Sequence, residues 1–179
     1  MSRDNVIKAA PPLKLVLAVL LALMVLGGCG YRPVTLRGPL AEANGVNVTL
    51  FANKSYRPGL EGRLARDLVD EFALRSGGRV LPGDQAQLEL TGTVLSYQNL
   101  AISYTALDTI KEYKAVIAVQ AILRQRQTLK VLWKADLSEE QSYPVNDNIP
   151  LQQNAEEAAI AKVSRRLSER IWQKIGERF

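Results

Sequence analysis

The residue best placed to do chemistry is Cys29, the only cysteine in this chain of 179 residues. It closes the tetrapeptide Leu26-Gly27-Gly28-Cys29, which follows an apolar run over residues 15–25 and a basic leader. A basic flank, a short apolar core and small residues before a cut are typical of a secretory signal, too short to span a membrane. Cleavage before Cys29 would expose a terminal cysteine whose thiol can carry a diacylglycerol.

This tetrapeptide resembles the lipobox of bacterial lipoproteins. The resemblance implies cleavage after Gly28 and attachment of acyl chains such as palmitate at Cys29. The alternative is a plain secreted protein with one buried cysteine. Gly30 stands where an aspartate would retain a lipoprotein of enteric bacteria in the inner membrane. We therefore expect delivery to the periplasmic side of the outer membrane.

The boundary at Cys29 divides the chain into three parts. We expect a signal peptide over residues 1–28, a lipidated tether over residues 29–45 and a single domain over residues 46–179. Within the tether, Gly38 and Pro39 are among the residues expected to interrupt every helix. The domain is long enough to bury one core.

Other catalytic chemistry is poorly represented in the composition. The chain contains no histidine, which removes most general-base and zinc arrangements. No glycine-rich phosphate loop is present, and acidic pairs such as Glu156/Glu157 are best explained as solvated helix faces. The net charge of +5 includes three basic residues of the leader, and the remaining excess is too small for a dedicated nucleic-acid binder. We expect no enzyme, no metal and no cofactor.

The domain alternates between two kinds of periodicity. Leu60, Leu64, Leu68 and Phe72 repeat at helical spacing before Gly77-Gly78, and a second apolar stripe runs from Ile160 to Ile175. Period-two alternation predicts strands over residues 46–51, 87–97, 113–123 and 129–137. Residues 53–59 and 144–150 are expected loops, and residues 99–110 fit either a strand end or a loop.

The order strand, helix, three strands, helix predicts an α+β fold. Each helix has one apolar stripe to bury, so both helices should pack on one face of a mostly antiparallel four-stranded sheet, as a two-layer sandwich. The last two strands form a hairpin whose turn needs an odd number of residues, for example residues 126–128. That turn would place Arg124 opposite Lys130 and Gln120 opposite Lys134, away from the helices.

Several segments resemble the LPS-assembly lipoprotein LptE family. Glu112-Tyr113 before the hairpin, Ser142-Tyr143-Pro144 after it and the final helix with Ala158, Ile160 and Leu167 also fit the family. The more specific segments are the opening Cys29-Gly30-Tyr31-Arg32-Pro33 and the strand-to-helix junction Phe51-Ala52-Asn53-Lys54-Ser55-Tyr56-Arg57-Pro58-Gly59-Leu60-Glu61. The resemblance covers residues 29–179. It implies an outer-membrane lipoprotein that sits inside the β-barrel LptD and helps insert lipopolysaccharide into the outer leaflet.

Two other interpretations stay open from the sequence. A strand, a Phe-x-Asn motif and an amphipathic helix also open the N-terminal domain of TolB-like and penicillin-binding-protein-activator lipoproteins, which act as protein-binding modules. The junction over residues 56–61 and Tyr31 argue against that resemblance. The third interpretation is a structural lipoprotein that links the membrane to the cell wall.

Two sets of residues are candidates for binding. Contacts with the barrel are expected from the loops over residues 53–59 and 99–111, where tyrosines offer amphipathic surface; each could equally be an ordinary half-buried residue. Lipopolysaccharide carries phosphates, so cations beside apolar surface are candidates for its contacts. The same cations could simply keep the sheet soluble and block edge pairing. The candidate partner residues are Tyr56, Tyr97 and Tyr104, and the candidate lipopolysaccharide residues are Lys111, Lys114, Arg124, Lys130 and Lys134.

Overall fold

The alternating segments form one sheet in the computed structural model, which describes residues 39–177. Cys29, the expected signal peptide and most of the expected tether lie outside the described residues. The described elements are α2 (Pro39–Glu42), β1 (Val46–Val48), β2 (Ala52–Asn53), α3 (Leu60–Ser76), β3 (Leu88–Tyr104), β4 (Ile110–Gln125), β5 (Val131–Pro144) and α4 (Ile149–Glu177).

The sheet has the strand order β1-β3-β4-β5, and β2 also pairs with β3. Strands β3, β4 and β5 form an antiparallel meander, whereas β1 and β2 run parallel to β3 because α3 carries the chain back before β3 begins. The strand expected over residues 46–51 ends at Val48; residues 49–51 lie between strands, with Leu50 exposed and Phe51 buried in the core, and β2 follows outside the expected bounds. The prediction of a mostly antiparallel sheet is confirmed.

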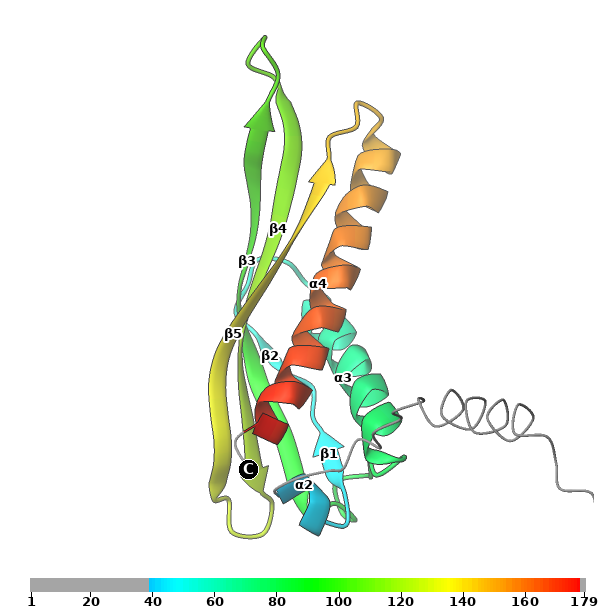
Figure 1. Cartoon of the computed structure of the whole chain (residues 1–179), viewed down its shortest axis with the longest axis vertical. Helices are drawn as coiled ribbons and strands as arrows, with labels where there is room; N and C mark the ends of the chain where they lie inside the picture. Colours follow the sequence, from blue (N-terminus) through cyan, green and yellow to red (C-terminus); the bar gives the residue numbers. More distant parts are fainter. Residues whose placement is uncertain (1–38, 178–179) are drawn as a thin grey trace, which may run out of the picture. The chain divides into compact units, whose positions relative to one another are not determined.

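Both long helices cover the same face of the sheet (Figure 1). Their buried stripes are the predicted ones, from Leu60 to Phe72 on α3 and from Ile160 to Ile175 on α4. The rings of Phe72 and Trp172 meet edge to face at 4.8 Å between the helices. The predicted α+β two-layer architecture is therefore confirmed. None of the described helices is long and apolar enough to cross a membrane.

A third, short helix begins inside the segment expected to be a tether. Helix α2 starts at Pro39, and Leu40 and Ala43 are buried against the core. The prediction that Pro39 interrupts every helix is wrong, because proline is tolerated in a helix's first turn, where its missing N–H has no partner to lose.

The segment over residues 99–111, expected to be a contact loop, is mostly strand. β3 continues to Tyr104 and β4 begins at Ile110, so the loop is limited to residues 105–109. Thr105 N–H donates to the Thr109 carbonyl at 2.8 Å and closes this turn. The resulting β3–β4 hairpin extends past the start of α4 (Figure 1).

The β4–β5 pair has the predicted coincidence of apolar faces but a different register. Gln125 N–H donates to the Lys130 carbonyl across the turn, and Leu132 is an extra residue between the pairs Arg124↔Val131 and Leu123↔Trp133. The expected opposition of Arg124 and Lys130 is therefore wrong. Away from this extra residue the register differs from the expected one by two residues, which keeps each side chain on its face, so alternation alone cannot distinguish the two pairings.

Candidate functional site

The junction between β2 and α3 is organised by the side chain of Asn53. Its Nδ2 donates to the Arg57 carbonyl at 2.8 Å and to Glu61 Oε2 at 2.6 Å, while its Oδ1 accepts from the Ser55 N–H at 2.9 Å. Gly59 precedes the helix with φ of 85°, a conformation that favours glycine. Hydrogen bonds from the Glu61 backbone N–H and from Asn53 lower the pKa of the Glu61 carboxyl. The loop is thus held in one conformation.

This loop positions Arg57 against the first turns of α4. The Arg57 guanidinium pairs with Glu156 at 3.0 Å and with the neighbouring Glu157, which Arg63 of α3 also approaches at 3.6 Å. A guanidinium fork suits two carboxylates because its donors diverge in one plane. The pairing joins two segments that are about 100 residues apart in the chain.

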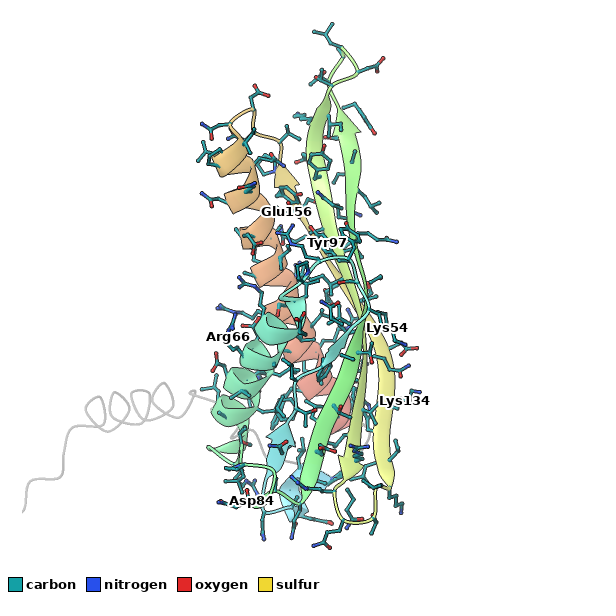
Figure 2. All side chains as sticks on the ribbon, turned by 180° about the vertical axis from the view of Figure 1, so that it is seen from behind. Lys54, Arg66, Asp84, Tyr97, Lys134 and Glu156 are labelled. Atoms are coloured by element: carbon teal, nitrogen blue, oxygen red, sulfur yellow. The ribbon has the colours of Figure 1, made fainter. Side chains whose placement is uncertain are left out.

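Tyr97 of β3 joins this group of charged side chains from the sheet. Its hydroxyl donates to Glu156 Oε1 at 2.6 Å, and the Arg57 guanidinium lies 5.8 Å from its ring centre. Figure 2 shows Tyr97 and Glu156 directed toward each other between the sheet and α4. Burial, followed by the hydrogen bond to Glu156, raises the pKa of the Tyr97 hydroxyl. We call Arg57, Tyr97, Glu156 and Glu157 the polar junction.

A second buried tyrosine lies beside the polar junction. Tyr143 near the end of β5 donates its hydroxyl to Asn99 Oδ1 at 2.8 Å. Burial and the charge of Glu156 raise the pKa of Tyr143 to about 12. The hydrogen bond to Asn99 ties β5 to β3 across β4, beside the projecting part of the hairpin.

The three predicted contact tyrosines have different surroundings. Tyr97 is only 2% exposed, so the prediction that it offers contact area on the surface is wrong. Tyr56 is 72% exposed, with its ring 5.6 Å from that of Tyr97, and Tyr104 is 58% exposed near the hairpin turn. Tyr56 and Tyr104 therefore remain available to a partner.

The five predicted cations do not form one patch. Lys111 and Lys114 lie in the projecting half of the hairpin, whereas Lys134 is opposite Ile122, eight residues from Lys114 along β4. Eight residues of strand span roughly 26 Å. Figure 2 shows Lys134 directed away from the helices, as predicted.

Two of the five cations are neutralised within the sheet. Arg124 Nε lies 2.5 Å from Glu89 Oε2, and Lys114 Nζ lies 2.9 Å from Glu140 Oε1. Gln120, expected opposite Lys134, instead faces Asp136 and donates to it at 2.8 Å. The exposed cations Lys111, Lys130 and Lys134 have no acidic partner within 4.0 Å among the described residues.

Exposed apolar side chains gather on the projecting part of the hairpin. Leu100, Ile102 and Leu107 are 45%, 40% and 87% exposed there, beside Tyr104. Within residues 39–177 no group of three or more cysteine, aspartate, glutamate or histidine residues could hold a metal ion. The arrangement is suited to contacts with another molecule.

Sequence reasoning missed the role of Glu156. It interpreted Glu156/Glu157 as a solvated pair, but the Glu156 side chain is only 17% exposed and bonds to both Arg57 and Tyr97. The available signal was Arg57, which lies in a segment that resembles the family and could pair with an acidic residue of the last helix. Such long-range pairing leaves no periodic pattern in the sequence.

Comparison with known proteins agrees with this fold. A family model described as LptE, lipopolysaccharide-assembly, matches residues 43–175. The crystal structure of rare lipoprotein B from Shewanella oneidensis is 14% identical, with a TM-score of 0.51 over 71% of this chain and 93% of that one. The solution structure of a lipoprotein B from Nitrosomonas europaea is 16% identical, with a TM-score of 0.52 over 82% and 90% of the two chains.

No curated protein matches the chain. At such low identities the solved structures establish the fold alone. The family model is more specific, because it extends from the residue after α2 through the buried stripe of α4 and includes the whole polar junction. The match covers well over half of the sequence, and the chain belongs to the LptE family of lipopolysaccharide-assembly proteins.

Proposed function

We propose that this chain is a lipoprotein anchored through Cys29 to the periplasmic side of the outer membrane, where it associates with the β-barrel LptD and assists lipopolysaccharide assembly. The family match over residues 43–175 is the observation that carries the proposal. The sequence Leu26-Gly27-Gly28-Cys29 supports the anchor. Two or more acyl chains would hold the protein stably at a membrane, whereas one binds reversibly.

The charges on the sheet are compatible with a place inside a barrel. A barrel lumen is polar and water-filled, so an occupant needs matched polar groups rather than an apolar surface. The face away from the helices carries the pairs Lys114–Glu140 and Arg124–Glu89 and the Gln120–Asp136 hydrogen bond. These contacts leave the face polar with little net charge.

Contacts with the barrel are assigned to the exposed tyrosines, Tyr56 on the junction loop and Tyr104 on the hairpin. Each ring offers a large apolar surface and a hydroxyl that can remain hydrogen-bonded at a wet interface. Tyr97 contributes indirectly, because its ring packs beside Tyr56 and its hydroxyl fixes α4 through Glu156.

Lipopolysaccharide contacts are assigned first to Lys111, Lys130 and Lys134, whose ammonium groups are exposed. Phosphate binding to these lysines would break no ion pair in the described part of the chain. Arg124 and Lys114 would have to leave Glu89 and Glu140 to bind phosphate, so their contribution is smaller.

Site-specific photocrosslinking in the native membrane tests the association. A photoreactive residue in place of Tyr56 or Tyr104 should capture LptD, identified by mass spectrometry. Leu74 on α3, which is 80% exposed, provides a control position outside the proposed contact and should not capture it. Capture of a peptidoglycan synthase instead of LptD would support the protein-binding alternative and contradict the proposal.

A further inference from the structure

The two edges of the sheet differ in their protection. On β5, Arg166 of α4 donates to the backbone carbonyl of Glu140, and Arg170 pairs with Glu139. Pro144 ends this strand and has no N–H to offer. Charged side chains, a proline and a covering helix are the devices by which proteins prevent unwanted pairing at an edge.

The opposite edge, on β3, is covered for only part of its length. β1 pairs with Leu88–Leu90 and β2 pairs with Thr93–Val94. The last bond on this side runs from the Lys54 N–H to the Val94 carbonyl at 2.9 Å. In the part of the chain that the structure describes, no strand pairs with this side of residues 98–104.

The register identifies which backbone N–H and C=O groups on this side of β3 have no partner strand. The Val94 carbonyl faces β2, and one extra residue at position 95 shifts the β3–β4 pairing between Val94 and Ser96. Because N–H and C=O of alternate residues point to opposite sides, the odd-numbered residues from 97 to 101 face away from β4, until a second irregularity between Ala101 and Ser103 changes the alternation again. The groups of Asn99 and Ala101 therefore point toward solvent.

The uncovered segment also lacks the usual protective residues. Residues 96–104, with the sequence SYQNLAISY, contain no charge, no proline and no glycine. Leu100, Ile102 and Tyr104 are exposed in it. An uncharged strand with free backbone groups is suited to pairing with another strand.

We propose that residues 98–104 of β3 accept an extended, uncharged segment of LptD as an added strand, an inference that rests on the proposed function. Backbone bonds to Asn99 and Ala101 would hold the segment, and apolar side chains would cover Leu100 and Ile102. This edge lies on the same projecting hairpin as Tyr104, the residue assigned above to the barrel contact.

The size of the edge favours LptD over a second copy of this chain. Seven residues of strand span roughly 23 Å. Pairing over that length buries far less than the surface of about 800 Å² per partner that a stable complex of two proteins needs. The edge therefore suits a segment of a protein that is also held by other contacts.

Hydrogen exchange on the full lipoprotein, free and in its purified complex with LptD, tests strand addition. The amides of Asn99 and Ala101 should exchange at least tenfold more slowly in the complex. Complex formation without this protection overturns the strand addition and leaves the association intact. If these amides are protected in the free protein, and more so at higher protein concentration, a second copy of this chain occupies the edge. That result would also overturn the proposal.

The variant Ala101→Pro provides an independent test. Its missing N–H faces away from β4, so no bond to β4 is lost, and proline is tolerated at such edge positions. Capture of LptD should fall at least tenfold; unchanged capture by the folded variant overturns the proposal. If this variant does not fold, the exchange measurement decides.

Asp147→Pro is the matched control, because Asn148 N–H donates to Asn146 Oδ1 at 3.0 Å across a turn that suits proline at its second position. It should capture LptD as the unaltered chain does. Failure of the unaltered chain to capture LptD would instead refute the proposed function.

Discussion

Single side chains decide how the first half of α4 is attached to the sheet. Glu156 accepts from Tyr97 and pairs with Arg57, and it is the shared partner of a strand and of the loop before α3. A carboxylate in such a partly buried place needs its partners, because an unsatisfied charge costs more than the bond contributes. Fixing Glu156 therefore fixes the helix start.

Tyr97→Phe should lower the free energy of unfolding by about 1–2 kcal/mol, because it removes one buried hydrogen bond to Glu156 while keeping the ring. Urea unfolding followed by circular dichroism measures the change. Tyr56→Phe is the matched control, since its ring is 72% exposed, and should change stability by less than about 0.5 kcal/mol. Equal effects of the two variants would contradict the role of the Tyr97 hydroxyl.

The pKa shifts of the buried tyrosines predict a loss of stability in alkali. Tyr143 has a pKa of about 12 in the folded chain, above its ordinary value of 10.0, and the pKa of Tyr97 is also raised. The folded state therefore holds these protons more tightly. The stabilisation is complete below pH 10 and is lost as the pH rises toward 12.

Unfolding free energies measured between pH 9 and pH 12 should fall more steeply for the unaltered chain than for Tyr143→Phe. Tyrosinate absorbance of the unaltered chain should include a component with a midpoint near pH 12 that Tyr143→Phe lacks. A single common midpoint would argue against the burial of Tyr143 as the cause.

At the scale of elements, close approach of β2, β3 and β4 depends on a residue without a side chain. A Cβ atom at Gly92 would collide with the Gln120 backbone carbonyl and with the ring of Phe51. By contrast, a Cβ at Gly62 on α3 would meet nothing within 4 Å. The two glycines therefore have opposite expected responses to the same substitution.

Gly92→Ala should destabilise the domain by about 2–3 kcal/mol through overpacking, whereas Gly62→Ala should stabilise it by about 0.5–1 kcal/mol through helix propensity. Thermal unfolding of the two variants beside the unaltered chain measures both. A stable Gly92→Ala variant would mean that Phe51 can move aside.

The elements themselves were largely predictable from the sequence, because periodic burial leaves a periodic pattern. The helical spacing of Leu64 and Leu68 predicts α3, and Trp133 belongs to the pattern that predicts the buried face of β5. The extra residue Leu132 was not predictable, since the sequence alternates without interruption there, although the bulge leaves Leu129 and Val131 exposed while Trp133 is buried. Without that register the pairing of Arg124 could not be inferred.

The candidate site was less predictable than the fold. Its polar contacts connect residues such as Arg57 and Glu156 that no short-range pattern relates. The length of β3 beyond Asn99 was also ambiguous, because its alternate residues are exposed on both faces of the projecting hairpin. Strand pairing there is provided by β4, and only the structure shows it.

At the scale of the whole molecule, replacing a single atom, the sulfur of Cys29, should remove the proposed anchor. Cys29→Ser replaces the thiol with a hydroxyl, so we expect no diacylglycerol and a protein that keeps its leader. Mass spectrometry of the mature N-terminus and membrane fractionation measure these outcomes. An unaltered chain that carries a free thiol at Cys29 would refute the anchor.

The proposed lipid contacts predict a charge effect that depends on position. Replacing Lys130 and Lys134 together by glutamine should weaken binding to purified lipopolysaccharide about five- to thirtyfold, since each exposed ionic contact contributes about 0.5–1 kcal/mol. The control Lys54→Gln with Lys162→Gln removes the same charge from other exposed sites. Equal losses in both variants would indicate attraction by net charge alone.

The parallel pairing of β1 and β2 with β3 has a consequence for how the chain is made. Val46 pairs with Leu88, so β1 has no strand partner until 42 further residues have been synthesised. At about 5–20 residues per second, this wait lasts roughly 2–8 s. During that time the apolar stripe of α3 is also without the sheet that buries it. A chain that emerges with its N-terminus first therefore exposes the apolar stripe of α3 until β3 has followed it.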